Sequence, residues 1–245
     1  FENKNLLAMS EKELDEIRGD ELTMIFQDPL TSLNPVFTVG SQIMESIRIH
    51  MHLSKEEARA RAVELLGRVG MPDAAGVMKK FPHTLSGGMR QRVMIAMALS
   101  CKPKLLIADE PTTALDVTIQ AQIMKLLGEL RREKNMAMIL ITHDIGVVAN
   151  MADRVIVMYA GQIVEEAPVL ALFDDPKHPY TRALLDTVPT IRDDESRQLT
   201  AIPGMVPENY DDITGCRFAD RCPYRQQECD SPQELYRFEE GHAAR

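Results

Sequence analysis

Three features are missing from this 245-residue sequence, and each absence excludes a class of protein. No apolar stretch approaches the roughly 20 residues that a membrane-spanning helix needs, and the first residues lack the pattern of a signal peptide. Positive charge is not in excess either: 28 Lys and Arg stand against 37 Asp and Glu, giving a formal net charge of −9. Such a chain has no global attraction for DNA or acidic lipid. We therefore expect a soluble cytoplasmic protein without a nucleic-acid partner.

Two short segments carry most of the chemical information. Ser86-Gly87-Gly88 is typical of a turn that opens a helix, where Ser is a good N-cap and free N–H groups attract anions such as phosphate. The run 105–110 is apolar and ends in Asp109-Glu110, as expected of a buried parallel strand with carboxylates at its C-terminal end. Each segment alone often arises by chance. Together they indicate a nucleotide, Mg²⁺ and phosphoryl transfer.

Three further motifs stand in order around these segments. Gln27 follows the apolar run 22–26, Asp116 follows the turn 113–115, and His143 ends a second apolar run, 139–142. The ordered set resembles the Q-loop, signature, Walker B, D-loop and H-loop of ABC-type ATPases. The resemblance implies an α/β fold: a P-loop NTPase core lacking its N-terminal strands, an inserted helical subdomain and a small irregular C-terminal module that contains cysteines.

The resemblance also implies a role for each motif. Glu110 would orient and polarise the attacking water, His143 would contact the γ-phosphate, and Gln27 would sense metal and phosphate. Asp109 would hold Mg²⁺ together with Gln27, because Mg²⁺ prefers few carboxylates and several waters. The residues expected to bind the ATP cofactor are Ser86, Gly87, Gly88, Gln91 and Asp116.

The phosphate-binding loop Gly-x-x-x-x-Gly-Lys-Ser/Thr is absent, and no Gly-Lys dipeptide occurs anywhere. In ABC ATPases this loop precedes the Q-loop by more residues than are present here. We expect a fragment or a gene model with a late start, a naturally degenerate subunit being the rarer explanation. In either case the chain alone is expected to bind ATP poorly and to be inactive as an ATPase.

The residues within and around the motifs indicate one branch of the family. The runs 24–29, 31–35, 85–99 and 107–120, and His178-Pro179-Tyr180-Thr181, are similar to the ATP-binding subunits of dipeptide and oligopeptide importers. The resemblance implies a head-to-tail pair of ATPase subunits under two membrane permease subunits, peripheral to the cytoplasmic face of the cell membrane. An extracytoplasmic binding protein would deliver peptide to the permeases, and residues 27–40 would receive them. Nickel, glutathione or antimicrobial-peptide uptake stays open as an alternative.

Three cysteines, Cys216, Cys222 and Cys229, lie within fourteen residues of the tail. In a cytoplasmic protein this density favours a metal over disulfides, but without a Cys-x-x-Cys pair the spacing is equally compatible with free thiols, zinc or an iron–sulfur cluster. In related importer subunits a fourth Cys commonly follows a Gly-His pair, and the four can hold a [4Fe–4S] cluster. Here Gly241-His242 is followed only by Ala-Ala-Arg, so the site would be one ligand short. A fourth cysteine, Cys101, is expected to be a buried structural thiol.

The periodicity predicts four parts: a partial ATPase core with the Q-loop at 1–38, a helical signature subdomain at 39–100, a RecA-like core at 101–187 and the cysteine module at 188–245. Strands are expected at 22–26, 105–109, 137–142, 154–159 and 162–165. The second to the fourth alternate with helices as βαβ units, and a hairpin turn at 159–162 leads into the fifth. Helices are expected at 10–17, 85–99, 117–133 and 145–150 and in short stretches up to 186. Beyond 188 we expect little regular structure.

Two functions from other classes compete with peptide import. A soluble ABC ATPase acting on nucleic acid or the ribosome is disfavoured by the acidic charge and by the His178-Pro179-Tyr180 tail. A degenerate, non-hydrolysing partner or redox-sensing subunit is suggested by the missing phosphate-binding loop and the cysteines.

Overall fold

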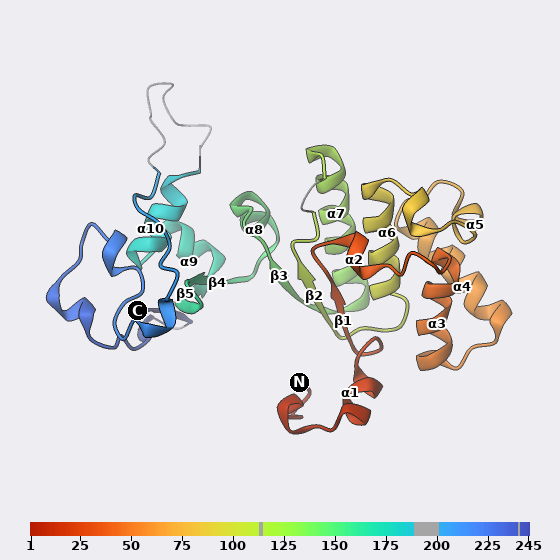
Figure 1. Ribbon diagram of the computed structural model, residues 1–245, viewed down its shortest axis with the longest axis horizontal. Coiled ribbons are helices and arrows are strands. Elements are labelled where there is room, and N and C mark those ends of the chain that lie inside the picture. The colour runs from red at the N-terminus through yellow and green to blue at the C-terminus, as the bar shows by residue number, and fades with distance from the viewer. Residues whose placement is uncertain (113–114, 189–200, 240) are drawn as a thin grey trace. The chain divides into compact units, whose positions relative to one another are not determined.

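The computed structural model describes residues 1–112, 115–188, 201–239 and 241–245, in two compact units, 1–143 and 144–245 (Figure 1). Residues 113 and 114 of the expected D-loop turn lie outside the described residues. None of the helices in the described part of the chain is both long and apolar enough to span a membrane. The four-part division of the chain stays a prediction.

The first unit contains a parallel sheet of three strands in the order β1-β2-β3. The strands are β1 (Leu22–Ile25), β2 (Leu105–Asp109) and β3 (Ala137–Ile141). The register pairs Met24 with Ile107 and Asp109 with Ile141. Because the three strands are parallel, their C-terminal ends lie at the same edge of the sheet. The loops that follow the strands at this edge commonly carry functional groups.

The helices of the first unit are α1 (Glu11–Ile17), α2 (Pro29–Ser32), α3 (Val39–Met51), α4 (Lys55–Arg68), α5 (Ala74–Val77), α6 (Gly87–Ala98) and α7 (Val117–Lys134), with short 3₁₀ turns at Leu6–Ala8 and Pro82–Thr84. Their starts follow the expected chemistry. Ser10 and Ser54 each form a capping box with the Glu three residues later.

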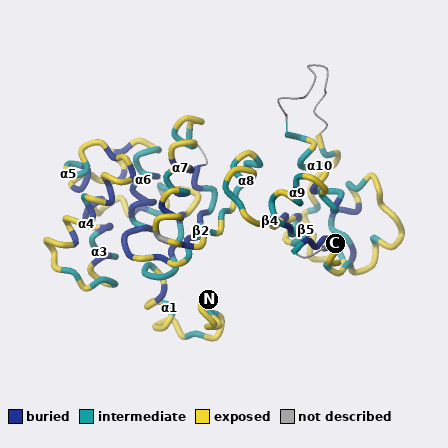
Figure 2. Tube along the Cα trace, turned by 180° about the vertical axis from the view of Figure 1, so that it is seen from behind, coloured by how far each residue is buried: buried dark blue, intermediate teal, exposed yellow. Residues whose placement is uncertain are grey.

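The core of the first unit lies between the sheet and these helices. Ile25, Leu106 and Ala108 are fully buried on the covered face, and α6 packs against β1. Figure 2 shows the buried residues along α6 and the inner sides of α3 and α4, with exposed residues on the outer turns. Cys101 is fully buried, so the expectation of a structural thiol is confirmed. Ile139 and Ile141, on the opposite face of β3, stay about half exposed, at 50% and 47%.

The second unit is built on an antiparallel sheet of four strands in the order β4-β5-β7-β6. The strands are β4 (Arg154–Tyr159), β5 (Gln162–Pro168), β6 (Tyr236–Glu239) and β7 (His242–Ala244). Ala160 and Gly161 join β4 to β5 with positive φ values of 46° and 78°, which matches the type I′ turn favoured in two-residue hairpins. The hairpin predicted from the sequence is therefore present.

Helices α8 (Ile145–Met151), α9 (Val169–Asp174) and α10 (Pro179–Asp186) complete this unit, with 3₁₀ turns at Tyr210–Asp212, Ala219–Arg221 and Gln227–Asp230. Its core joins the hairpin to the cysteine-containing tail. Phe218, 1% exposed, packs its ring against Tyr159 and Tyr180 at centroid distances of 5.2 and 5.4 Å. Arg221 adds a hydrogen bond from Nη1 to the Tyr159 hydroxyl at 3.1 Å.

Two expectations about this part of the chain are wrong. The run 154–159 does not extend the parallel sheet as a βαβ unit, because β4 turns back on itself through a two-residue loop and pairs antiparallel with β5. The tail also has more regular structure than expected, since β7 pairs with β5 through Glu165–Ala244 and Glu166–Ala243. The tail strands β6 and β7 are short and follow a charged, turn-rich stretch, so the alternation of apolar and polar residues that identifies strands is weak there.

Candidate active site

Glu110 lies at the C-terminal end of β2 and is contacted from both neighbouring strands. Gln27, two residues beyond β1, donates a hydrogen bond from Nε2 to Glu110 Oε2 at 2.8 Å. His143, two residues beyond β3, places Nδ1 3.0 Å from Glu110 Oε1. Three residues that are far apart in the sequence thus meet at one edge of the sheet, as the motifs predict.

The backbone of Glu110 is held in an unusual conformation. Its φ is +42°, in the left-handed region that side-chain-bearing residues rarely adopt. Its N–H donates to the Ile141 carbonyl at 2.9 Å, which continues the β2–β3 pairing by one residue. The carboxylate is therefore turned towards Gln27 and His143 by a fixed backbone.

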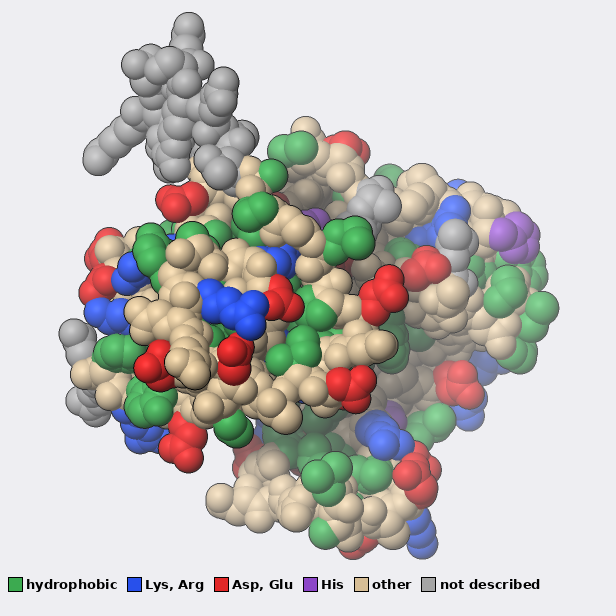
Figure 3. All heavy atoms as spheres, turned by 60° about the vertical axis from the view of Figure 1, so that its left-hand side comes forward, with side chains coloured by type: hydrophobic (Ala, Val, Ile, Leu, Met, Phe, Trp, Pro, Cys, Tyr) green, Lys and Arg blue, Asp and Glu red, His purple; other side chains and the backbone are tan. Residues whose placement is uncertain are grey.

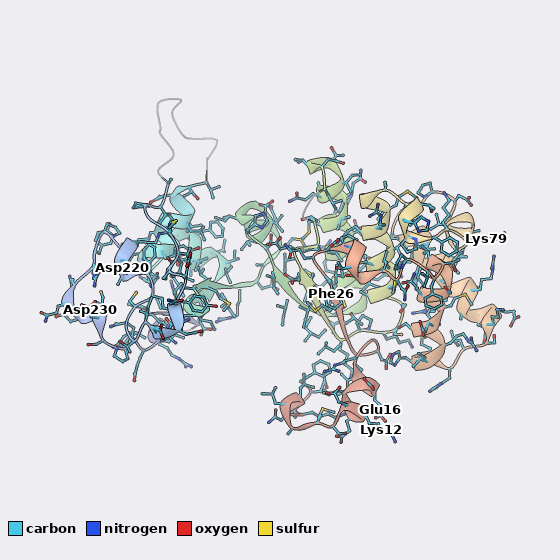
Figure 4. All side chains as sticks on the ribbon, viewed as in Figure 1. Lys12, Glu16, Phe26, Lys79, Asp220 and Asp230 are labelled. Carbon is cyan, nitrogen blue, oxygen red and sulfur yellow. The ribbon has the colours of Figure 1, made fainter. Side chains whose placement is uncertain are left out.

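The side chains of Glu110 and His143 differ in exposure. The Glu110 side chain is 22% exposed, and that of His143 is 75% exposed. An ionised carboxylate only accepts, so Nδ1 of His143 donates in this hydrogen bond. In Figure 4 Phe26 marks where the chain leaves β1 just before Gln27. The set resembles a water-orienting acid flanked by an amide and an imidazole, as hydrolysis of a phosphoanhydride requires.

Asp109, the last residue of β2, is half-buried beside these groups. Together with the amide oxygen of Gln27 it could supply the few oxygen ligands that Mg²⁺ takes while it keeps its waters. The donor chemistry of this edge therefore fits a Mg²⁺–nucleotide complex.

The predicted nucleotide-contacting segments lie at the starts of α6 and α7. Ser86 caps α6, its side chain accepting from the Met89 N–H at 3.4 Å, and Asp116 caps α7 by accepting from the Ile119 N–H at 3.0 Å. A Cβ on Gly88 would lie 3.5 Å from Ile119, so the two helix starts are adjacent. Ser86 and Gly87 are exposed, as an anion-binding turn must be, and a Cβ on Gly87 would meet no atom within 4 Å.

Gln91, one turn into α6, does not share this exposure. Its side chain is 2% exposed, and Nε2 donates to the carbonyl of Pro111, next to Glu110. The predicted contact between Gln91 and the nucleotide stays a prediction.

The three tail cysteines form a loose group of free thiols. The backbone N–H groups of Tyr224 and Gln226 point at the sulfurs of Cys222 (3.4 Å) and Cys229 (3.5 Å). Burial raises the pKa of Cys216, and the neighbouring Cys229 and Cys222 raise it further. A Cβ on Gly215 would lie 2.2 Å from the Cys229 carbonyl oxygen, so only glycine lets Cys216 approach this loop.

Within the described ranges, no group of three or more His, Cys, Asp or Glu side chains is arranged to hold a metal ion. The N–H···S contacts are nevertheless of the kind that support thiolate ligands. In Figure 4 Asp220 and Asp230 mark the loop around these cysteines; both accept from Arg225, at 2.5 and 2.9 Å.

Sequence reasoning missed a buried polar network in the second unit. Glu165 on β5 is 0% exposed and accepts from the backbone N–H groups of Lys177 (2.7 Å) and His178 (3.0 Å). His242 Nε2 lies 2.8 Å from its Oε1. Burial alone would raise the pKa of Glu165, but these hydrogen bonds outweigh it, and the pKa is lowered. The only signal in the sequence is the pair of acidic residues Glu165 and Glu166 at the end of a predicted strand.

This network explains the His178-Pro179-Tyr180 motif. His178 caps α10, its Nδ1 accepting from the Tyr180 N–H at 3.0 Å, and Pro179 occupies the first helical position, where a missing N–H costs nothing. Tyr180 packs on Tyr159 and Phe218. Burial lowers the pKa of His178 to about 4, which the charge of Glu165 only partly opposes. The motif is thus a structural clamp between α10 and β5.

Comparisons with known proteins agree with this site. The pattern of the family described as "ABC transporter" matches residues 3–113, and that of "Oligopeptide/dipeptide transporter, C-terminal region" matches residues 164–229. The Dipeptide transport ATP-binding protein DppD of Escherichia coli (strain K12) is 56% identical over 229 residues, which cover 94% of this chain and 70% of that protein. This chain belongs to the ABC transporter ATPases that carry the oligopeptide/dipeptide transporter C-terminal region.

Other members of this ABC transporter family are similarly close. The Oligopeptide transport ATP-binding protein AppD of Bacillus subtilis (strain 168) is 57% identical, with the same coverage of 94% and 70%. A Putative peptide import ATP-binding protein of Brucella abortus (strain 2308) is 52% identical over the whole chain and 74% of its own length.

Solved structures support the fold. The ATP-binding cassette MJ0796, in a dimeric post-hydrolysis state bound to ADP and Pi, superposes with a TM-score of 0.63 at 32% identity, covering 69% of this chain and 72% of that one. The cbiO1 subunit from Clostridium perfringens gives a TM-score of 0.59 at 34% identity, covering 71% and 67%. The expectation of an ABC-type α/β ATPase fold is therefore confirmed.

Proposed function

We propose that this chain is the ATP-binding and ATP-hydrolysing subunit that energises uptake of dipeptides or oligopeptides through a membrane ABC importer. The observation that carries the proposal is the Gln27–Glu110–His143 group at the carboxyl edge of β1-β2-β3. Its chemistry is that of phosphoanhydride hydrolysis, and relatives named for dipeptide and oligopeptide transport share more than half of the sequence.

Each side chain has a role in this proposal. Glu110 accepts a hydrogen bond from the attacking water and orients it, and His143 fixes that water from the other side through its exposed imidazole. Gln27 responds to the metal and the γ-phosphate, and its hydrogen bond to Glu110 transmits that response to the carboxylate. Asp109 and Gln27 would hold Mg²⁺, which neutralises charge on the phosphoryl oxygens when it is bound.

The second set of residues serves a partner subunit. Ser86, Gly87, Gly88 and Asp116 lie at two adjacent, exposed helix starts, where backbone N–H groups favour phosphate. We assign them to the nucleotide held by the phosphate-binding loop of a second ATPase subunit, in a head-to-tail pair. Such a pair contains two composite sites, and this chain contributes half of each.

The permease subunits would bind to the surface formed by residues 27–40 and the helical segment that follows. A groove of about 620 Å³ opens on α3 and the loop before it, and Val36, Phe37 and Ile49 expose 71%, 54% and 58% of their surfaces. Exposed apolar side chains gathered on one surface are typical of a protein–protein contact. In this proposal the chain is a peripheral subunit at the cytoplasmic face of the membrane.

The tail is proposed to bind iron and sulfide. Cys216, Cys222 and Cys229 would supply thiolate ligands to a [4Fe–4S] cluster, supported by the N–H groups that point at two of the sulfurs. Anaerobically purified protein should then carry iron, sulfide and a broad visible absorption that the Cys222→Ala variant loses. A colourless, iron-free preparation of the wild-type protein would leave the cysteines as free thiols or a zinc site.

A nucleic-acid or ribosome-directed function has less support. Acidic and basic side chains are interspersed on the face shown in Figure 3, and the net charge of −9 adds no attraction for phosphate backbones. No observation favours that function over transport.

The test of the proposal is ATP hydrolysis by the importer assembled from this subunit, its partner ATPase and the permeases in lipid vesicles. We expect hydrolysis to rise several-fold when peptide-loaded binding protein is added, together with peptide accumulation. A rate of ATP hydrolysis that does not change when peptide-loaded binding protein is added would contradict the transport function. So would stimulation of hydrolysis by RNA or DNA.

A further inference from the structure

Gln91 links the helix that carries Ser86 to the loop that carries Glu110. It lies one turn into α6 (Gly87–Ala98), is 2% exposed, and donates from Nε2 to the carbonyl of Pro111. A long polar side chain that is buried to make one hydrogen bond to the backbone has a positional role, because its burial is otherwise unfavourable.

The bond reaches the one strained residue of the site. Glu110 has a φ of +42°, and its own N–H is fixed by the Ile141 carbonyl at 2.9 Å. On its other side, the carbonyl of Pro111 is fixed by Gln91. The backbone that aims the Glu110 carboxylate is thus held from β3 on one side and from α6 on the other. Strained conformations persist only where such surroundings enforce them.

Further contacts join α6 to α7 near the same loop. Arg92 Nη2 donates to Gln122 Oε1 at 2.8 Å, and Gly88 lies close enough to Ile119 that a Cβ would meet it at 3.5 Å. Figure 1 shows α6 and α7 side by side next to β2. The start of α6, residues 110–112 after β2 and the start of α7 are therefore packed together, and a shift of α6 would displace residues 110–112.

We propose that Gln91 is a positioning residue for hydrolysis: through Pro111 it sets the position of the Glu110 carboxylate and makes that position depend on α6. The inference rests on the proposed function, because it assigns Glu110 to ATP hydrolysis. Since Ser86 at the start of the same helix serves the opposite nucleotide, Gln91 connects the two half-sites that this chain contributes.

The first test uses the chain itself and needs no nucleotide. Gln91→Met keeps the length and volume of the side chain and removes the donor. We expect the Glu110 amide to exchange with deuterium at least ten-fold faster than in the wild type, while amides of Ile47 in α3 and Leu106 in β2 keep their protection. Gln122→Met is the matched control: it removes a bond between α6 and α7 without touching Pro111, and Glu110 exchange should stay within two-fold.

The second test uses the assembled importer. We expect Gln91→Met and Gln91→Glu, which also lacks a donor when ionised, to lower kcat for ATP at least ten-fold with KM for ATP within two-fold. A purely structural role would instead raise KM and lower the amount of folded subunit. Gln122→Met should keep kcat within two-fold.

The two tests separate the inference from the function on which it rests. Unchanged Glu110 exchange in Gln91→Met, or a loss of protection spread equally over Ile47 and Leu106, overturns the positioning role. So does wild-type kcat in both Gln91 variants. An assembled wild-type importer that hydrolyses no ATP overturns the proposed function, whereas selective exchange at Glu110 would still support the structural link.

Discussion

His143 Nδ1 lies 3.0 Å from Glu110 Oε1, and this contact joins the ends of two neighbouring parallel strands. The same carboxylate accepts from Gln27, two residues beyond β1, at 2.8 Å. One acid is therefore held between an amide and an imidazole, each delivered by its own strand. The arrangement leaves the imidazole largely exposed, where it can reach a phosphate or a water.

Loss of His143 should slow hydrolysis without unfolding the chain, because its side chain is 75% exposed. We expect His143→Ala to lower kcat of the assembled importer about 100-fold, the lower end of what positioned acid–base groups contribute. His83→Ala, which removes another exposed histidine, is the control and should leave kcat unchanged. Equal rates in the two variants would exclude His143 from the site.

Glu165 should be essential for the stability of the second unit. Glu165→Ala removes a fully buried acceptor and leaves the N–H groups of Lys177 and His178 unpaired, at a cost of about 3–5 kcal/mol. Glu166→Ala, one residue on, removes only a half-exposed carboxylate at 3.9 Å from Arg154, worth about 0–1 kcal/mol. Urea unfolding of both variants measures the difference. Similar losses in the two would contradict the clamp.

The clamp should also make stability depend on pH. The pKa of His178 is about 4 in the folded chain against 6.5 for an unperturbed histidine, so the unfolded chain binds more protons between these values. The stability from His178 is therefore present above pH 6.5 and is lost as the pH falls to 4. Protonation of Nδ1 also abolishes the cap on Tyr180.

His178→Asn isolates this effect, because an Asn side chain caps a helix without titrating in this range. Its free energy of unfolding should vary less between pH 6.5 and 4 than that of the wild type. Glu165, whose pKa is lowered, adds stability that is lost at still lower pH in both proteins. Parallel pH curves for the two proteins would contradict the assigned role of His178.

Gly215 should tolerate no side chain. In Gly215→Ala the new Cβ would lie 2.2 Å from the Cys229 carbonyl oxygen and 2.8 Å from the Asp230 carbonyl carbon. We expect the loop around Cys216 to open and thermal stability to fall. Gly67→Ala, inside α4 with no atom within 4 Å, should instead stabilise the chain by about 0.5–1 kcal/mol. A melting temperature unchanged by Gly215→Ala would show that the loop adapts.

The parallel sheet and its catalytic edge could be predicted because local signals there agree with the fold. The strand 105–109 has the predicted bounds, and Ser10, Ser54, Ser86 and Asp116 cap helices as their positions indicate. Ordered motifs then indicated that Gln27, Glu110 and His143 come together. Their hydrogen-bond geometry follows from strand register, which the sequence pattern leaves open.

The tail was harder to predict because its structure depends on contacts distant in sequence. β7 forms by pairing with β5, and the buried His242 places Nε2 2.8 Å from Glu165 Oε1. Nothing local marks His242 as buried, and charged residues such as Glu165 are rarely inside. The role of Gln91 was likewise hidden, since an amide in a polar motif gives no sign that it bonds to Pro111.

The most direct test of the account is the Glu110→Gln variant in the assembled importer. Gln keeps the size of the side chain but lacks the carboxylate that orients the water, so ATP should bind and close the ATPase pair while steady-state hydrolysis falls at least 100-fold. Nucleotide-induced pairing and phosphate release are measured on the same sample. Stable pairing with ATP and negligible phosphate release is the predicted result. Phosphate release at the wild-type rate would contradict the central role of Glu110.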